Sequence, residues 1–343
     1  MADEVTVAHV AEVAVALVGR PEGGWTVVRD SGTSIVLRGN DVVVKRTHRG
    51  QAAFEAEIFG LRAVEECAPG LAPALVGADD PSRVVVMTDL GDGPSVADLL
   101  LADCPDEAAA ALVAHGRALA SLHNASWAPS TVPLRKPNWL RERHSDAEAA
   151  LASVGIPSPV LEAFRALGDR LLWGTGPRVL SPGDVCPDNN VIVDGDVRLF
   201  DFEGCGHMHP AMDLAYLALP NPTCWCSFDI PEETKTAAIA AYIDEVKDPV
   251  GVDDLHLALA LLATTSIGLT LGQDGLDEPW TSERGVLMPS PAQRLIHRVR
   301  VAADRSALRV EHPELATWLD AQLTGFIGRW PHAEILPVAP AFR

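Results

Sequence analysis

Basic residues are scarce in this chain of 343 residues. Lysine and arginine together number 27 against 47 aspartates and glutamates, which gives a formal net charge of −20. A protein that holds nucleic acid by its phosphates needs a basic surface, so the overall charge argues against a nucleic-acid partner. The same acidity fits a cationic substrate or a polyphosphate handled with a divalent metal, although it also simply favours solubility.

Long apolar runs are missing as well. No window reaches the roughly 18 uninterrupted apolar residues of a membrane span. The most apolar window, residues 255–272, contains His256 with several Ser and Thr residues, and we expect a buried helix there. The start of the chain is acidic, and His9 and Glu12 interrupt its apolar run, unlike a secretory signal. We therefore expect no membrane partner and a cytoplasmic location.

Closely set cysteine pairs of the zinc-binding kind are also absent from the sequence. Cys224 and Cys226 have one residue between them, whereas zinc ligands are typically about two to four residues apart. The remaining cysteines are scattered at positions 67, 104, 186 and 205. This pattern predicts reduced, mostly buried thiols.

Apolar residues make up 48% of the chain, which is enough for a packed core throughout. Three strand-like runs lie in residues 23–47 and two more in residues 73–95, and the chain from Gln51 between them has helical spacing. Helical patterns follow at 95–126, with a break near Cys104–Pro105, and at 145–172, 231–246, 252–270, 291–310 and 313–329. The prediction is an α+β protein with a small antiparallel β-sheet and one key helix in residues 1–90, a hinge at about 88–95, and a larger, mainly helical lobe in residues 91–343.

Two carboxylates and an amide surround a predicted hairpin in residues 179–204, VLSPGDVCPDNNVIVDGDVRLFDFEG. Asp184 and Asn189 precede its first strand, and Asp201 ends its second. Because hairpin strands bring the residues flanking the turn together, Asn189 and Asp201 can face one pocket, where their oxygens suit Mg²⁺. Asp184 is then available to act on a hydroxyl nucleophile, as in phosphoryl transfer. Taken singly, each Asp could instead be a turn residue.

The same stretch resembles the catalytic segment of the aminoglycoside phosphotransferase and choline kinase family, which has a protein-kinase-like bilobal fold. The matching positions are Gly183, Asp184, Pro187, Asn189 and Asp201. The later segment HPAMDLAYL resembles the family's Asp-Pro-x-x-Asp-Leu-Ala motif, and the resemblance implies that Asp213 braces the catalytic loop. Three motifs in this order, at family spacing, are far more specific than any one of them.

A separate part of the resemblance lies in the first ninety residues. Lys45 is one of four lysines, and it ends an apolar strand where kinase-like proteins place the lysine that grips the α- and β-phosphates. The resemblance implies Glu57 as its ion-pair partner, with Glu55 as the alternative. It also implies that the turn at Ser31 and Gly32 covers the phosphates.

The segment VVVMTDLGDG resembles the hinge of the family, where the backbone of Thr88 and Leu90 would meet an adenine edge. One position departs from the family pattern, because Pro182 stands where the family has His two residues before the catalytic Asp. Proline fixes φ while it removes a hydrogen-bond donor, so we interpret it as a tolerated structural change. A catalytically silent nucleotide-binding or scaffold protein is the alternative.

The resemblance implies an enzyme that uses ATP (or GTP) and Mg²⁺ to phosphorylate a small-molecule hydroxyl. We expect an aminoglycoside or another antibiotic-like acceptor, possibly cationic; choline-, sugar- and amino-alcohol-type acceptors stay open, as does the oligomeric state. Trp225 and Phe228 lie among carboxylates in residues 221–233, where they could bind an amine or anchor a loop. Protein kinase activity is disfavoured, because the 12 residues from Asp201 to Asp213 leave no room for a long activation segment.

Overall fold

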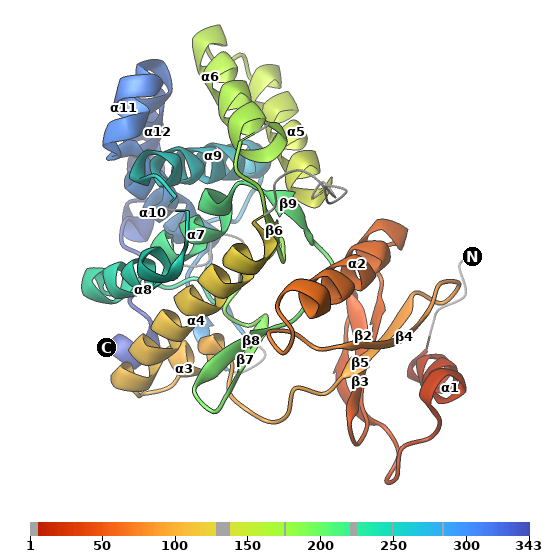
Figure 1. The fold of residues 1–343 in the computed structure, drawn as a ribbon. Coiled ribbons are helices and arrows are strands. Elements are labelled where there is room, and N and C mark those ends of the chain that lie inside the picture. The colour runs from red at the N-terminus through yellow and green to blue at the C-terminus, as the bar shows by residue number, and fades with distance from the viewer. Residues whose placement is uncertain (1–5, 128–137, 175, 220–224, 249, 283–284) are drawn as a thin grey trace.

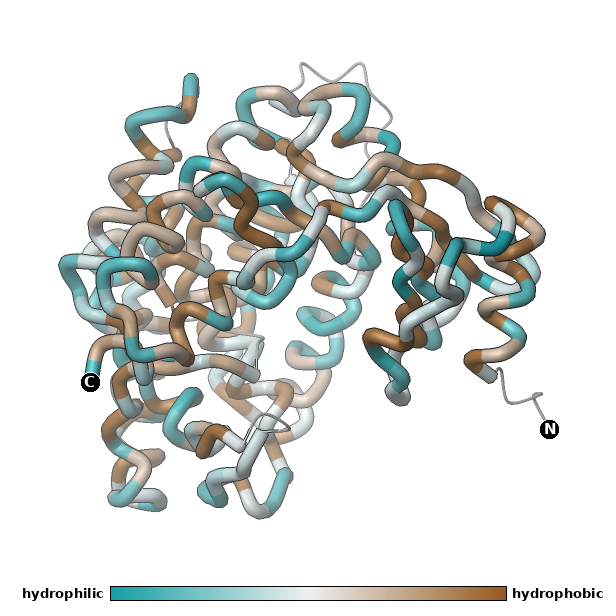
Figure 2. The backbone as a smooth tube through the Cα atoms, turned by 90° about the horizontal axis from the view of Figure 1, so that it is seen from below, coloured by the Kyte–Doolittle hydropathy of each residue, from teal (hydrophilic) through white to brown (hydrophobic). Residues whose placement is uncertain are grey.

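The computed structural model describes residues 6–127, 138–174, 176–219, 225–248, 250–282 and 285–343. The chain forms a smaller, sheet-containing lobe at its N-terminal side and a larger, mainly helical lobe (Figure 1). Seen from below, the sheet-containing lobe and the C-terminus lie at opposite sides of the molecule (Figure 2). This mixture of one antiparallel sheet and a helical remainder confirms the predicted α+β class.

The N-terminal lobe is a five-stranded antiparallel sheet with a helix on each face. Its strands run in the order β1-β2-β3-β5-β4, with bounds β1 (Thr26–Asp30), β2 (Ser34–Arg38), β3 (Val42–Thr47), β4 (Leu75–Asp79) and β5 (Val84–Thr88). The helices are α1 (Val7–Val18) and α2 (Gln51–Cys67). Alternation along β5 separates the two faces, because Val84 and Val86 join the cluster under α1, whereas Val85 and Met87 join the main core beside α2.

The larger lobe is built around one buried helix. Its helices are α3 (Val96–Leu101), α4 (Pro105–Ser126), α5 (Asn138–Ser153), α6 (Ser158–Gly168), α7 (Pro210–Ala218), α8 (Glu232–Glu245), α9 (Val252–Thr270), α10 (Pro291–Ala303), α11 (Ser306–Glu311) and α12 (Pro313–Arg329), with a π-helical turn at Asp169–Trp173 and 3₁₀ turns at Pro331–Ala333 and Pro340–Phe342. Helix α9 packs against α5, α6, α7, α10 and α11. By length and composition it is the one helix in the described ranges that could cross a membrane, and most of it is buried inside this lobe.

Three short strand pairs complete the larger lobe. They are β6 (Val179–Ser181) with β9 (Gly206–Met208), β7 (Asn190–Val193) with β8 (Asp196–Leu199), and β10 (Trp280–Thr281) with β11 (Leu287–Met288). The hairpin β7–β8 has the predicted place, with Asn190 opposite Leu199. The β6–β9 pair was not predicted, and it encloses the whole stretch from Pro182 to Cys205 between its strands.

The structure differs from the sequence-based predictions in two local respects. Helix α5 begins at Asn138, seven residues before the predicted start at 145, because Trp139 and Leu140 lie on its packed side. The expectation of reduced thiols is wrong for Cys186, which is disulfide-bonded. Cys67, Cys104, Cys205 and Cys226 are reduced thiols, as expected, although Cys104 is exposed; Cys224 lies outside the described residues.

Candidate active site

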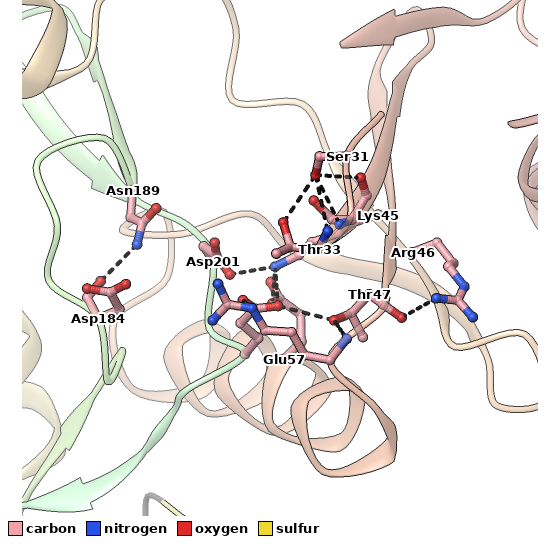
Figure 3. A network of polar contacts seen from close by, with 12 residues as sticks. Ser31, Thr33, Lys45, Arg46, Thr47, Glu57, Asp184, Asn189 and Asp201 are labelled. Carbon is pink, nitrogen blue, oxygen red and sulfur yellow. Dashed lines mark hydrogen bonds and ion pairs between the residues drawn. The ribbon is translucent and has the colours of Figure 1, made fainter. Parts of the chain in front are cut away.

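Lys45 on β3 points toward α2 and the larger lobe. Its partner across the ladder is Val85, which belongs to the main core, whereas its neighbour Val44 packs under α1 on the opposite face. On the α2 side, Lys45 Nζ donates to Glu57 Oε2 over 2.7 Å and to Asp201 Oδ1 over 2.5 Å (Figure 3). A further carboxylate, Glu203, lies 3.6 Å from the same nitrogen. Lys45 therefore forms ion pairs with carboxylates of both lobes.

Helix α2 selects Glu57 rather than Glu55 as the partner of Lys45. Glu57 is buried on the inward face of the helix, whereas Glu55 is exposed and accepts a hydrogen bond from Gln51 at 3.3 Å. The two carboxylates are two positions apart, which on a helix places them on different faces. The structure thus distinguishes the two candidates that the sequence left open.

The charges of Lys45 and Asp201 stabilise each other. Burial acts to lower the pKa of Lys45, but the charges of Asp201, Glu57 and Glu203 outweigh it and raise that pKa. Burial acts to raise the pKa of Asp201, but Lys45 and the nearby arginines hold it below its ordinary value. Burial prevails at Glu57, whose pKa is raised despite the lysine. Lys45 and Asp201 are both ionised near neutral pH.

Asp201 is held in an unusual backbone conformation by close packing around it. Its φ is +66°, in the left-handed region that is rare for a residue other than glycine. The next residue, Phe202, is fully buried against Gly60 of α2, so closely that a Cβ on Gly60 would lie 2.5 Å from the Cβ of Phe202. Glycine at position 60 therefore lets α2, which carries Glu57, approach the strand end that carries Asp201.

The loop that carries Asp184 is braced from α7. Asp213 accepts a hydrogen bond from Ser181 Oγ at 2.7 Å, and Ser181 Oγ in turn accepts one from the backbone N–H of Gly183 at 2.9 Å. Gly183 has φ of +88°, and a Cβ there would come within 2.1 Å of the Gly204 carbonyl oxygen. Only glycine fits this position. Asp213 therefore fixes the residue that precedes Asp184 on the loop.

Asp213 is itself held by a buried histidine. His123 of α4 lies 3.0 Å from Asp213 through Nε2 and 2.7 Å from the Tyr242 hydroxyl through Nδ1. A carboxylate accepts, so Nε2 of His123 carries a proton and donates it to Asp213. Burial and the charge of Asp213 raise the pKa of Tyr242, which keeps the hydroxyl protonated. The brace continues through four side chains from Tyr242 to Ser181, and Pro182 is buried beside it without contributing a hydrogen bond to it.

A cleft of about 410 Å³ opens between the lobes and collects most of the predicted site residues. Lys45, Glu57, Thr88, Leu90, Asn189 and Asp201 all line it. Three predicted residues do not: Ser31, Gly32 and Asp184 lie outside its wall. Asn189 nevertheless joins Asp184 to this cleft, because its Nδ2 donates to the Asp184 carbonyl oxygen at 3.0 Å (Figure 3).

The turn at Ser31 and Gly32 is closed by its own hydrogen bonds. Ser31 Oγ accepts from the backbone N–H groups of Thr33 and Ser34, both at 3.3 Å. Gly32 has no left-handed φ, and a Cβ there would meet open space. The conformation of this turn as it stands does not depend on glycine at position 32.

The connection between the lobes is fixed by an arginine. Arg38 of β2 pairs with both Asp89 and Asp92, and Thr88 donates its backbone N–H to the Ala74 carbonyl at 2.9 Å. Leu90, by contrast, has no backbone hydrogen-bond partner among the described residues. Its peptide groups lie at the wall of the cleft, where they are available to a ligand.

Comparison with known proteins identifies this arrangement. Residues 28–251, about two thirds of the chain, match the phosphotransferase enzyme family. The chain belongs to this family. No curated protein matches the chain significantly.

Solved structures show the same fold as this phosphotransferase. The streptomycin-ATP-APH(2")-IIa ternary complex has 14% identity and a TM-score of 0.54, covering 89% of this chain and 98% of that one. A choline/ethanolamine kinase family protein from Mesorhizobium loti has 16% identity and a TM-score of 0.55, covering 92% and 99%. A putative fructosamine-3-kinase from Thermobifida fusca has 20% identity and a TM-score of 0.51, covering 77% and 93%. These similarities establish the protein-kinase-like fold predicted from the motifs.

Asp188, which from the sequence is more readily interpreted as a loop residue than as a ligand, lines the phosphotransferase cleft. Asp188 accepts a hydrogen bond from Trp225 Nε1 at 2.6 Å, while its other oxygen, Oδ1, is buried without a hydrogen-bond partner in the described part of the chain. Burial raises its pKa. Its position next to Asn189 was the available signal. Trp225 thus anchors its segment to the catalytic loop, and Phe228 is buried in the core.

Proposed function

We propose that this phosphotransferase transfers the γ-phosphoryl group of ATP or GTP to the hydroxyl of a small molecule, with Mg²⁺. The observation that carries the proposal is the contact of Lys45 with Glu57 and Asp201 across the cleft between the lobes. The same three side-chain types in one cleft, beside a braced Asp–Asn loop, are the parts that phosphoryl transfer uses.

The nucleotide side of the proposal assigns roles to residues of the cleft. Lys45, positioned by Glu57, would neutralise the α- and β-phosphates, and the backbone of Thr88 and Leu90 would receive the base. The amide of Thr88 is engaged with Ala74, so the contacts fall to its carbonyl and to the unengaged peptide groups of Leu90. The Ser31–Gly32 turn would approach the phosphates from above the cleft.

The residues present fit a magnesium ion. Asn189 uses Nδ2 on the Asp184 carbonyl, which leaves Oδ1 as a hard ligand, and Asp201 uses Oδ1 on Lys45, which leaves Oδ2. Amide and carboxylate oxygens are the ligands that Mg²⁺ takes from proteins. When bound, the ion would supply charge neutralisation to the phosphates. The buried Oδ1 of Asp188 is a further acceptor at the same wall of the cleft.

Asp184 is the residue we assign to the acceptor. Its carbonyl is held by Asn189, and the neighbouring Gly183 is fixed by the Asp213–Ser181 brace. A carboxylate on a braced loop can orient a hydroxyl and take its proton as the phosphoryl group transfers. Pro182 does not weaken this assignment, because the brace runs through Ser181.

The acceptor is the least determined part of the proposal. The names of the similar structures mention streptomycin, gentamicin, choline, fructosamine and macrolides as relevant to those proteins. Such variety is typical of a fold in which a shared nucleotide-binding site is combined with different acceptor sites. Aminoglycosides and other antibiotics are the acceptors expected from the motifs, with choline-, sugar- and amino-alcohol-type compounds as alternatives, and a cytoplasmic location stays a prediction.

The test is nucleotide consumption by the purified protein with Mg²⁺ across such acceptors. We expect one acceptor class to stimulate ADP or GDP release and to gain the mass of one phosphoryl group, and EDTA to abolish the reaction. Nucleotide binding without turnover for any acceptor would favour the silent scaffold. Absence of nucleotide binding would contradict the assignment of the cleft.

A further inference from the structure

A second cavity, of about 270 Å³, lies among α5, α9 and α10 in the larger lobe. Apolar side chains form most of its wall, including Trp139, Leu140, Leu172, Met212, Leu261 and Leu295, and the hydroxyls of Thr265, Ser266 and Thr270 lie on one side. An apolar cavity with a few polar groups is the usual form of a small-molecule site.

This cavity adjoins the catalytic loop. Trp139 forms part of its wall and packs so tightly on Gly204 that a Cβ there would lie 2.4 Å from the indole Nε1. The Gly204 carbonyl in turn touches Gly183, the residue before Asp184. Two direct contacts therefore link the wall of the cavity to the loop that carries the proposed acceptor residue.

The cavity is positively charged in a chain that is strongly negative. The described residues that line it include three arginines, Arg143, Arg294 and Arg298, and no carboxylate. Arg294 and Arg298 are one turn apart on α10, where like charges repel. The whole-chain acidity, which favoured a cationic acceptor, therefore does not describe this site.

Arg298 contributes a positive charge to the cavity wall that no described carboxylate balances. Its hydrogen bond to the hydroxyl of Ser266, at 3.3 Å, is a contact with a neutral group, and it has no carboxylate partner among the described residues. Arg170 of the same lobe pairs with Asp254 and Glu311, and Arg309 pairs with Asp320. Arg141 and Arg178 have no carboxylate partner among the described residues either, but they donate to backbone carbonyl oxygens. Burial lowers the pKa of Arg298 to about 9, with Arg294 adding to the effect, so the guanidinium is still charged at neutral pH.

A second arginine lies at the same wall. Arg143 is placed over the Trp139 ring, 5.6 Å from its centroid. Arg298 is partly withdrawn from water without a carboxylate partner in the described part of the chain, and a bound anion would supply the missing counter-charge. Arginine is also the side chain best suited to a carboxylate or a phosphate, because its donors match their geometry.

We propose that this cavity binds an anionic group of the acceptor, a carboxylate or a phosphate, so that the enzyme phosphorylates a hydroxyl compound that carries such a group. This rests on the proposed function, since it supplies the acceptor for the cleft described above. It predicts that cationic and neutral acceptors are the poorer substrates.

Binding is tested first, with inorganic phosphate and with gluconate, by their effect on the thermal unfolding midpoint. Wild type is compared with Arg298→Gln and with Arg300→Gln, a matched control on the same helix whose side chain pairs with Glu334 outside the cavity. We expect both anions to raise the midpoint of wild type and of Arg300→Gln by clearly more than that of Arg298→Gln. Equal shifts in all three proteins, or no shift in any, would overturn the proposal. The nucleotide cleft is the same in all three proteins, so any shift from phosphate bound there is common to them and does not affect the difference between their midpoints.

Turnover is tested with acceptors that differ in charge on a similar skeleton: gluconate and glucose 6-phosphate against glucose, and against kanamycin and choline. We expect stimulation by an anionic member, and the preferred one separates carboxylate from phosphate. Arg298→Gln should raise the acceptor KM about tenfold, from the loss of a charged hydrogen bond, and leave the nucleotide KM unchanged. Preference for a neutral or cationic acceptor would overturn the proposal. Loss of nucleotide binding would instead contradict the proposed function, and the unfolding comparison would still decide the cavity.

Discussion

Lys45 Nζ lies 2.5 Å from Asp201 Oδ1, so a strand of the N-terminal sheet is ion-paired with a residue 156 positions later in the chain. The lysine is almost buried, and Glu57 supplies its second carboxylate. An ion pair removed from water depends on complete pairing, because a partner left alone is costly. The site is therefore preorganised before any ligand enters, with charge balance shared between both lobes.

The first prediction concerns the carboxylate behind the lysine. Glu57→Gln keeps a hydrogen-bond acceptor near Lys45 but removes the charge that positions it, and we expect turnover to fall at least about tenfold. Glu55→Gln, on the exposed face of the same helix, should change turnover less than about twofold. Initial rates of nucleotide consumption measure both variants. Equal losses would show that α2 does not position Lys45 through Glu57.

The brace of the catalytic loop predicts a loss of both stability and activity. Ser181→Ala leaves the Gly183 N–H and a carboxylate oxygen of Asp213 without their partner inside the protein. A buried group left unsatisfied typically costs about 1–3 kcal/mol of unfolding free energy. Urea unfolding measures it, with Ser153→Ala at an exposed helix end as the control. A change below about 0.5 kcal/mol in Ser181→Ala would contradict the brace.

Alanine substitutions at two helical glycines distinguish the cost of disrupting close packing from the gain in helix propensity. Gly60→Ala places a Cβ against Phe202, and we expect lower stability and lower turnover because α2 must move away from Asp201. Gly325→Ala in α12, where a Cβ meets open space, should stabilise the protein by about 0.5–1 kcal/mol. Unfolding midpoints and rates of both variants test this. Similar behaviour of the two alanines would contradict the packing of α2 on Phe202.

A buried histidine predicts how stability depends on pH. Burial lowers the pKa of His115 in α4 from 6.5 to about 4. Below pH 6.5 the unfolded chain therefore binds a proton that the folded protein does not, and stability falls as the pH drops toward 4. His209 and His297, with pKa values also lowered to about 4, act in the same direction.

The contribution of His115 is isolated by substitution. Between pH 6.5 and 4, the unfolding free energy of wild type should decline faster than that of His115→Leu, by up to about 1.4 kcal/mol per pH unit. Above pH 6.5 the difference should be constant. His332→Leu, an exposed histidine, serves as the control. Parallel curves for wild type and His115→Leu would contradict a neutral buried imidazole.

The sequence predicted the residues that lie on regular elements. Lys45 and Glu57 were expected from the family resemblance, and the structure places both side chains on inward faces of β3 and α2. The hairpin that carries Asn189 and Asp201 follows from two short apolar runs around a turn. The brace by Asp213 came from the motif, although its hydrogen-bond partner, Ser181, did not.

What could not be predicted depends on how helices pack. The basic cavity is formed by α5, α9 and α10, which are distant in sequence, and no local pattern fixes their relative position. The buried oxygen of Asp188 and its link to Trp225 arise in the same way. The acidity of the whole chain does not predict the charge of this cavity, because net charge sums over the entire surface whereas the cavity charge comes from Arg143, Arg294 and Arg298.

The most direct measurement compares turnover and nucleotide binding in Asp184→Asn. The control is Asp196→Asn, which removes an exposed carboxylate from the nearby hairpin turn. If Asp184 takes the proton of the acceptor, its variant should lose at least about a hundredfold in turnover while its nucleotide Kd stays within about twofold of the control. Turnover in Asp184→Asn equal to that of Asp196→Asn would contradict the account.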